Sequence, residues 1–108
     1  MPNLKPNELE ALRKLKDTLA RDFRLVELRL FGSKARGDSR LESDIDVLIV
    51  LEDVDRDVRK RVSVLCCDLS IDCHVVITPI LYSLAEFNSG RTRVTPFYRN
   101  LEREGVPV

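Results

Sequence analysis

Apolar positions recur along the first half of the chain with two different periods. In residues 7–23, leucines and a phenylalanine are spaced by three and four positions among charged residues, which predicts an amphipathic helix with Asn7 as its N-cap. In residues 25–31, apolar and polar residues alternate, which predicts a strand that ends at Gly32. Residues 44–51 form a second predicted strand, and its later half is apolar on both faces, as expected at the centre of a sheet.

The pattern changes twice more in the second half of the chain. Residues 53–70 carry an apolar stripe at helical spacing, which predicts a helix capped by Asp53 or Asp55. Residues 71–77 are mostly β-branched and apolar, so they predict a third strand. His74 falls on this predicted strand, and we expect it to be a packed or solvent-facing side chain rather than a metal ligand.

Two Thr-Pro pairs follow, and such a pair favours a helix start because Thr caps a helix and Pro suits its first position. Thr78-Pro79 predicts a short helix, and Thr95-Pro96 predicts a last helix that ends at Gly105. The order of elements predicts an α/β (α+β) fold, with a small mixed β-sheet of at least three strands flanked by helices. With 108 residues, the chain is expected to form a single domain over residues 1–108.

Composition and charge narrow the functional classes. The 18 basic residues cancel the 18 acidic ones, so net charge gives no reason to expect duplex DNA as a partner. The longest apolar run, residues 47–51, is far shorter than the roughly 20 residues of a membrane span, and the N-terminus lacks a secretory signal pattern. Three cysteines without Cys-x-x-Cys spacing suit a reducing compartment and do not favour a structural zinc site. We therefore expect a cytoplasmic protein.

Asp44 and Asp46 are the first candidates for chemistry. Because they are two positions apart on a strand, both carboxylates point to one face, with their Cα atoms about 6.6 Å apart. Like charges this close call for a cation, and Mg²⁺ prefers one or two carboxylates together with water and substrate phosphates. The alternative is a capping aspartate and a surface ion pair with Arg36 or Arg40.

Asp72 is the candidate for a third acid. If the third strand lies beside the second, about 4.8 Å away, Asp72 reaches the same point as the first two acids. Asp68 is a competing candidate, but it falls at the end of the predicted helix. Three acids on two strands can hold two metal ions roughly 4 Å apart, the arrangement used in phosphoryl and nucleotidyl transfer. The sequence therefore predicts two Mg²⁺ ions held by Asp44, Asp46 and Asp72.

Gly32 and Ser33 are the candidates for holding a triphosphate. A glycine after the first strand lets backbone N–H groups approach phosphate oxygens, and the serine hydroxyl adds a donor. Lys34 and Arg36 add positive charge nearby. Ser33 is alternatively an ordinary turn or capping serine, and Arg36 is alternatively paired with a neighbouring acid.

The spacing of these residues carries a resemblance to a known family. Gly32-Ser33, ten residues, and then Asp44-x-Asp46 resembles the signature of nucleotidyltransferases of the DNA polymerase β superfamily. The strings at residues 31–37 and 43–48 are most similar to its minimal nucleotidyltransferase (MNT) branch, and so are residues 96–100 and 104–106. The resemblance implies that Asp44, Asp46 and Asp72 ligate Mg²⁺, and that Asp72 helps to deprotonate the attacking hydroxyl.

The same resemblance implies the reaction and the partner. Proteins of the MNT branch typically use ATP, and they are commonly encoded beside a HEPN-domain protein as an antitoxin that can AMPylate it. We therefore expect an adenylyltransferase acting on a hydroxyl, such as a tyrosine, of a HEPN-type partner, and the chain itself could form a homo-oligomer. The alternatives are a non-catalytic antitoxin that neutralises its partner by occlusion, or transfer to a small molecule or an RNA end.

The last third of the chain is rich in aromatic and basic residues. We expect the aromatic side chains to complete the core or a subunit contact, with a partner surface as the alternative. The residues concerned are Tyr82, Phe87, Phe97 and Tyr98, beside Arg91, Arg93 and Arg99.

Overall fold

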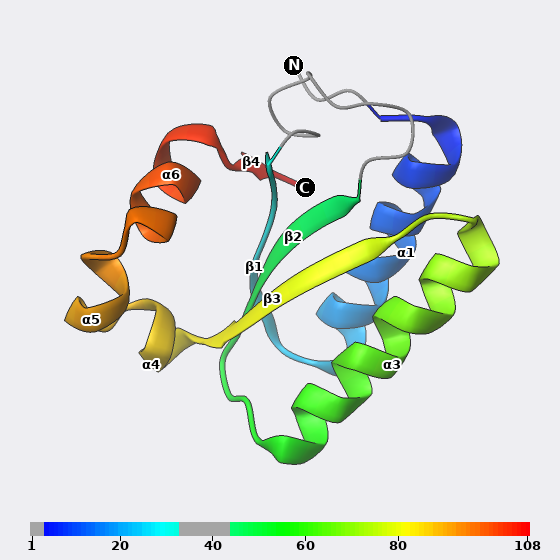
Figure 1. Cartoon of the computed structure of the whole chain (residues 1–108). Helices are drawn as coiled ribbons and strands as arrows, with labels where there is room; N and C mark the ends of the chain where they lie inside the picture. The colour runs from blue at the N-terminus through cyan, green and yellow to red at the C-terminus, as the bar shows by residue number, and fades with distance from the viewer. Residues whose placement is uncertain (1–3, 33–43) are drawn as a thin grey trace.

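A computed structural model of the chain describes residues 4–32 and 44–108 as helices and strands around one mixed sheet (Figure 1). This confirms the predicted α/β architecture. Helices α1 and α3 lie on one side of the sheet, and the three short helices near the C-terminus lie on the other. The elements are α1 (Pro6–Asp22), β1 (Leu25–Phe31), β2 (Ile45–Leu51), α3 (Arg56–Cys73), β3 (Ile77–Ser83), α4 (Leu84–Phe87), α5 (Gly90–Arg93), α6 (Pro96–Glu104) and β4 (Val106–Pro107).

The strands lie in the order β3-β2-β1-β4. Strand β2 pairs with β1 in antiparallel orientation and with β3 in parallel orientation, and β4 pairs with the far side of β1. Every residue of β2 except Asp46 is buried, because the strand has a neighbour on each side and helices over both faces. The predicted central position of this strand is confirmed.

Alternate residues of β2 enter two separate hydrophobic clusters. Ile45, Val47, Ile49 and Leu51 pack under α1 and α3 with the leucines of the α1 stripe. Leu48 and Val50 point the other way and pack with Phe87 of α4 and Leu101 of α6. The period-2 pattern of the sequence therefore decides which β2 side chains each layer of helices covers.

The first helix begins at Pro6, and its N-cap is Lys5 rather than Asn7 as predicted. Proline favours the first helical position because its fixed φ suits the helix and its missing N–H has no partner to lose there. Asn7 instead lies in the first turn, and its side-chain amide donates hydrogen bonds to the carbonyl oxygens of Cys73 and His74, at 3.0 and 3.4 Å. This contact ties the start of α1 to the end of α3.

The strand predicted at residues 71–77 is wrong. Helix α3 continues to Cys73, and β3 begins only at Ile77. The buried stripe of α3 includes Cys66, Leu69 and Cys73, so burial of that face prolongs the helix beyond the predicted end. His74 ends the helix with φ of 55°, in the left-handed region.

Thr78 and Pro79 also differ from prediction, because they lie inside β3 and start no helix. Strand β3 is at the edge of the sheet, where a proline is tolerated because one side of the strand needs no donor. The other predicted helix caps are confirmed: the Asp55 carboxylate accepts a hydrogen bond from Val58 N at 2.8 Å, and the Thr95 hydroxyl accepts one from Tyr98 N at 3.1 Å. Gly105 ends α6, as predicted.

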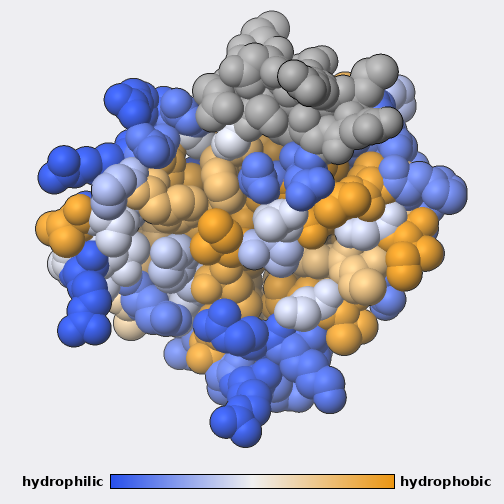
Figure 2. Space-filling model, viewed as in Figure 1, coloured by the Kyte–Doolittle hydropathy of each residue, from blue (hydrophilic) through white to orange (hydrophobic). Residues whose placement is uncertain are grey.

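The surface of the described residues carries scattered apolar side chains. Val94, Ile71 and Val76 are each more than half exposed, and Figure 2 shows hydrophobic residues interspersed with hydrophilic ones. Exposed apolar residues of this kind are normal in folded proteins. In residues 4–32 and 44–108, none of the helices has the length and apolar character needed to cross a bilayer.

The three cysteines are free thiols, and two of them are part of the core. Cys66 and Cys73 are buried in the layer between α3 and the sheet, while Cys67 is exposed. Burial raises the pKa of the Cys66 thiol to about 11, so this side chain stays protonated at neutral pH.

Candidate active site

Asp44 and Asp46 lie at the start of β2, as predicted. Asp44 immediately precedes the strand and is exposed, while Asp46 is its second residue and is half-buried. Asp46 has the same orientation in the strand as Leu48 and Val50, so it faces the side of the sheet that carries α4, α5 and α6. The two hydrophobic residues are covered by these helices, and the acids precede them on the same face.

Gly32 lies directly against the Asp46 carboxylate. A Cβ atom at Gly32 would lie 2.5 Å from Oδ2 of Asp46, closer than real Cβ contacts. The φ of Gly32 is +72°, in the region that glycine adopts without steric cost. Phe31, the residue before it, is the cross-strand partner of Asp46. The backbone at the end of β1 and the carboxylate at the start of β2 are therefore packed together at a position that only glycine fits well.

Thr78 of β3 lies beside the acid pair, on the side of β2 opposite to β1. It is the register partner of Asp46 across the parallel pairing of β2 and β3. Its hydroxyl donates a hydrogen bond to Oδ2 of Asp44 at 3.3 Å. Thr78 was not among the predicted site residues, because the Thr78-Pro79 pair predicted a helix cap and not a strand position beside the acids.

The electrostatics of the acid pair favour a cation. Burial raises the pKa of the Asp46 carboxyl above its usual range, and the negative charge of Asp44 raises that pKa further. A divalent cation between the two carboxylates would oppose both effects. The alternative partners, Arg36 and Arg40, lie outside the described residues.

Asp72 does not lie on a strand beside the other two acids. It is an exposed residue of the last turn of α3, and Asp68, the competing third acid, is exposed on the same helix. In the described ranges, 4–32 and 44–108, no group of three or more His, Cys, Asp or Glu residues lies close enough to hold a metal ion. The prediction of a three-acid cluster depended on a strand at residues 71–77, and the extension of α3 removes that geometry.

The remaining predicted nucleotide-binding residues follow Gly32. Ser33, Lys34 and Arg36 lie outside the described residues. His74 is exposed at the end of α3, so the solvent-facing alternative is the one observed, although on a helix cap and not on a strand.

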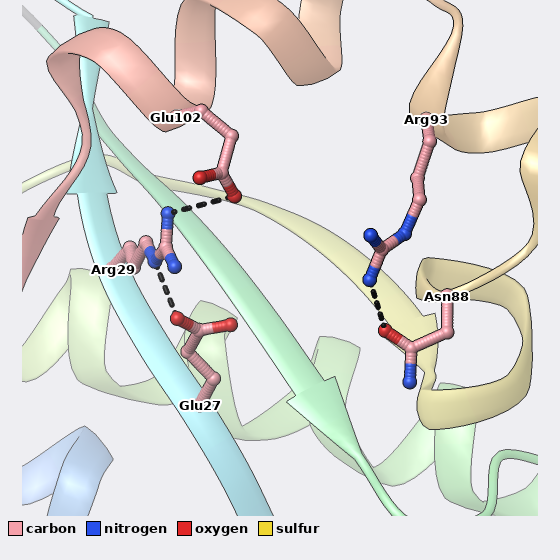
Figure 3. A network of polar contacts seen from close by, with 5 residues as sticks. All are labelled: Glu27, Arg29, Asn88, Arg93 and Glu102. Atoms are coloured by element: carbon pink, nitrogen blue, oxygen red, sulfur yellow. Dashed lines mark hydrogen bonds and ion pairs between the residues drawn. The ribbon is translucent and has the colours of Figure 1, made fainter.

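The aromatic residues of the last third pack into the second hydrophobic cluster, which confirms the core interpretation for that region. Phe87 is buried, and its ring contacts the half-buried rings of Tyr82 and Tyr98 at centroid distances of 5.9 and 5.4 Å. Arg93 lies over the ring of Tyr98 and donates a hydrogen bond to the Asn88 side chain at 3.1 Å (Figure 3). These contacts hold α4, α5 and α6 together over β2 and β3.

Comparison with known proteins identifies the family of this chain. Residues 12–99 match the model of a family described as "Nucleotidyltransferase domain". A protein of Methanocaldococcus jannaschii, named provisionally as protein adenylyltransferase MJ0604, is 41% identical over 101 residues, which cover 92% of this chain and 95% of that protein.

Two solved structures have the same fold. A structure described provisionally as a minimal nucleotidyltransferase has a TM-score of 0.62 and 26% identity, covering 93% of this chain and 95% of its own. A structure of a tri-AMPylated HEPN toxin of Shewanella oneidensis in complex with MNT antitoxin has a TM-score of 0.54 and 20% identity, covering 94% of this chain and 70% of its own.

Proposed function

Because this chain belongs to the nucleotidyltransferase domain family, we propose that it transfers AMP from ATP to a hydroxyl group of a partner protein, with Mg²⁺ held by Asp44 and Asp46. The observation that carries the proposal is the grouping of Gly32, Asp44, Asp46 and Thr78 at the meeting point of β1, β2 and β3. A glycine backbone against the Asp46 carboxylate suits a metal-bound triphosphate, since the phosphates need close N–H donors and the metal needs hard oxygen ligands.

The donor set fits Mg²⁺. Mg²⁺ is usually coordinated by one or two protein carboxylates, while phosphates and water complete its coordination shell. Asp44 and Asp46 supply two carboxylates, and one oxygen of Asp44 is hydrogen-bonded to Thr78. When bound, the ion neutralises the triphosphate and stabilises the negative charge that develops during transfer. Burial, and then the charge of Asp44, raise the pKa of the Asp46 carboxyl, and a bound cation would oppose both effects.

The phosphate side of the site begins at Gly32. The absence of a side chain lets the backbone approach within contact of the Asp46 carboxylate, so a metal on that carboxylate and a phosphate on the neighbouring backbone N–H groups would be adjacent. Ser33, Lys34 and Arg36 stay predictions as further triphosphate contacts. Asp72 has no role in this proposal, because its helical position separates it from the acid pair.

The reaction is a displacement at the α-phosphorus. The acceptor hydroxyl oxygen forms a bond to the α-phosphorus, the bond from that phosphorus to the bridging oxygen breaks, pyrophosphate leaves with the bonding electron pair, and the hydroxyl proton passes to solvent water. Asp44 and Asp46 would hold the metal ion, which would supply positive charge at the α-phosphate, and the backbone at Gly32 would orient the leaving pyrophosphate.

The acceptor proposal comes from the relatives. MJ0604 is named as a protein adenylyltransferase, and the Shewanella structure pairs an MNT antitoxin with an AMPylated HEPN toxin. We infer that this chain modifies a HEPN-type partner in the same manner and thereby acts as an antitoxin. Neutralisation by occlusion alone is the competing outcome of the experiment that follows.

The test uses ATP labelled in its α-phosphate, Mg²⁺ and the protein encoded beside this chain, which we expect to carry a HEPN domain. We expect label on the partner, and we expect Asp44→Asn and Asp46→Asn each to reduce transfer by two orders of magnitude or more, since each removes a charged ligand. Asp72→Asn is the matched control, because it removes the same charge from an exposed position on α3.

Three results would contradict the proposal. Neutralisation that persists in both Asn variants without label transfer supports occlusion. Label on a small molecule or an RNA end assigns a different acceptor. A loss of transfer in Asp72→Asn equal to that in Asp46→Asn would place Asp72 in the catalytic centre and contradict a centre built from two acids alone.

A further inference from the structure

Two phenylalanine rings, set at nearly right angles to each other, form an apolar wall beside the acid pair. Phe31 is the last residue of β1 and lies directly across from Asp46 in the strand register. Phe97, in the first turn of α6, meets the Phe31 ring edge to face, with the centroids 5.4 Å apart and the ring planes at 86°. Both side chains are only half-buried, so part of the wall is open to solvent.

The second hydrophobic cluster has one end near the acid pair, and this wall forms that end. Going away from Asp46 along β2, the next residues on the same face are Leu48 and Val50, which are fully buried under α4 and α6. Phe87 lies in this buried part. The cluster therefore changes from a closed core around Phe87 to a partly open aromatic surface at Phe31 and Phe97.

The position of Phe97 is fixed by contacts at both ends of α6. The Thr95 hydroxyl caps the start of the helix. Near its end, Glu102 pairs with Arg29 of β1 at 3.6 Å, and Arg29 also pairs with Glu27 on the same strand (Figure 3). Gly105, which ends α6, packs against the Arg29 side chain, where an added Cβ would lie 3.3 Å from its Cδ. A wall held in this way is pre-organised for a flat ligand.

We propose that the Phe31–Phe97 wall binds the base of the nucleoside triphosphate, and that it favours a purine because a purine has the larger face for stacking. This inference rests on the proposed function, since it assumes an α-phosphate held at Asp44 and Asp46. A nucleoside attached to that phosphate meets the wall next, because Phe31 is the direct neighbour of Asp46 in the sheet. Stacking of a base on an aromatic side chain contributes roughly tenfold or more to affinity.

The test compares a ligand that has a base with one that has none. Binding of ATP and of tripolyphosphate, each with Mg²⁺, is measured by calorimetry for the wild-type chain and for Phe97→Leu. We expect ATP affinity to fall roughly tenfold in the variant while tripolyphosphate affinity is unchanged, because only ATP contacts the wall. Phe97→Tyr keeps the ring and is expected to retain the wild-type ratio of the two affinities, and the wild type is expected to bind ATP more tightly than CTP.

Phe87→Leu is the matched control, because it removes an aromatic ring from the closed part of the same cluster. It is expected to lower thermal stability at least as much as Phe97→Leu, but to leave the ratio of ATP to tripolyphosphate affinity unchanged. If Phe97→Leu does not fold, Phe97→Met replaces it, since Met fills irregular space well.

The outcomes separate this inference from the proposed function. A wild-type chain that binds both ligands, together with a Phe97 variant whose two affinities are unchanged or fall by the same factor, would overturn the aromatic wall and leave the proposed function standing. A wild-type chain that binds neither ligand in the presence of Mg²⁺ would overturn both.

Discussion

Replacing Gly32 by alanine tests the contact on which the site depends. The φ of +72° places an alanine in the left-handed region, which costs about 1–2 kcal/mol for a residue with a Cβ atom. The added Cβ would also lie 2.5 Å from Oδ2 of Asp46, so the carboxylate has to move by about 0.9 Å to restore ordinary contact. Moving it out of its rotamer costs about a further 0.5–1.5 kcal/mol.

The expected loss in the free energy of unfolding is therefore about 2–3 kcal/mol, and urea denaturation should show a midpoint lowered by about 1–2 M. Metal-dependent ATP binding should weaken as well, because the displaced carboxylate is a proposed ligand. Gly90→Ala is the matched control: its new Cβ would meet no atom within 4 Å, and alanine favours the helix α5 that contains it.

A double-mutant cycle separates the two contributions. In the Asp46→Ala background the carboxylate is gone, so Gly32→Ala should cost only the backbone part, about 1–2 kcal/mol. The reasoning is refuted if Gly32→Ala destabilises the chain no more than Gly90→Ala, or if its cost is the same with and without the Asp46 carboxylate.

Three further predictions concern the acids and the thiols. The raised pKa of the Asp46 carboxyl means that the folded state binds its proton more tightly than the unfolded state, so ionisation of this group lowers the stability of the fold as the pH rises from 3.8 through the folded pKa. In metal-free buffer, Asp46→Asn should therefore be more stable than wild type at pH 7, and the difference should vanish below pH 4. Urea denaturation at several pH values measures this difference. Thr78→Asp adds a carboxylate beside Asp46, so it should lower the free energy of unfolding in EDTA and tighten Mn²⁺ binding several-fold. Electron paramagnetic resonance measures the Mn²⁺ affinity, and an unchanged affinity would contradict the register of β3. A thiol reagent at neutral pH should modify the exposed Cys67 before the buried Cys66, whose pKa is about 11, and equal rates at the two thiols would contradict their burial.

The sequence alone predicted those elements whose pattern of apolar and polar residues fits only one type of secondary structure. Strand β1 follows from the alternation of apolar and charged residues over 26–30, and β2 follows from an apolar run with two acids at its start. The acid pair of Asp44 and Asp46 could be found for the same reason, since both lie within or beside a well-defined strand.

The segment between α3 and β3 could not be predicted, because β-branched residues fit a strand locally while the core favoured a helix. Leu69 and Cys73 continue the spacing of the α3 stripe, and this was the signal that the helix extends beyond residue 70. The left-handed end at His74 carries no glycine to mark it. Because residues 71–77 were predicted as a strand, Asp72 was expected as the third acid and Thr78 was not expected in the site. The place of Thr78 in the site depends on the register of two strands that are distant in sequence.

Anomalous scattering from Mn²⁺ tests the central claim most directly, in crystals of the chain with a non-hydrolysable ATP analogue. The proposal predicts an anomalous peak within about 2.5 Å of carboxylate oxygens from both Asp44 and Asp46, with the triphosphate of the analogue on the same ion. A peak bound by other side chains, or a triphosphate bound away from Gly32 and the two acids, would contradict it.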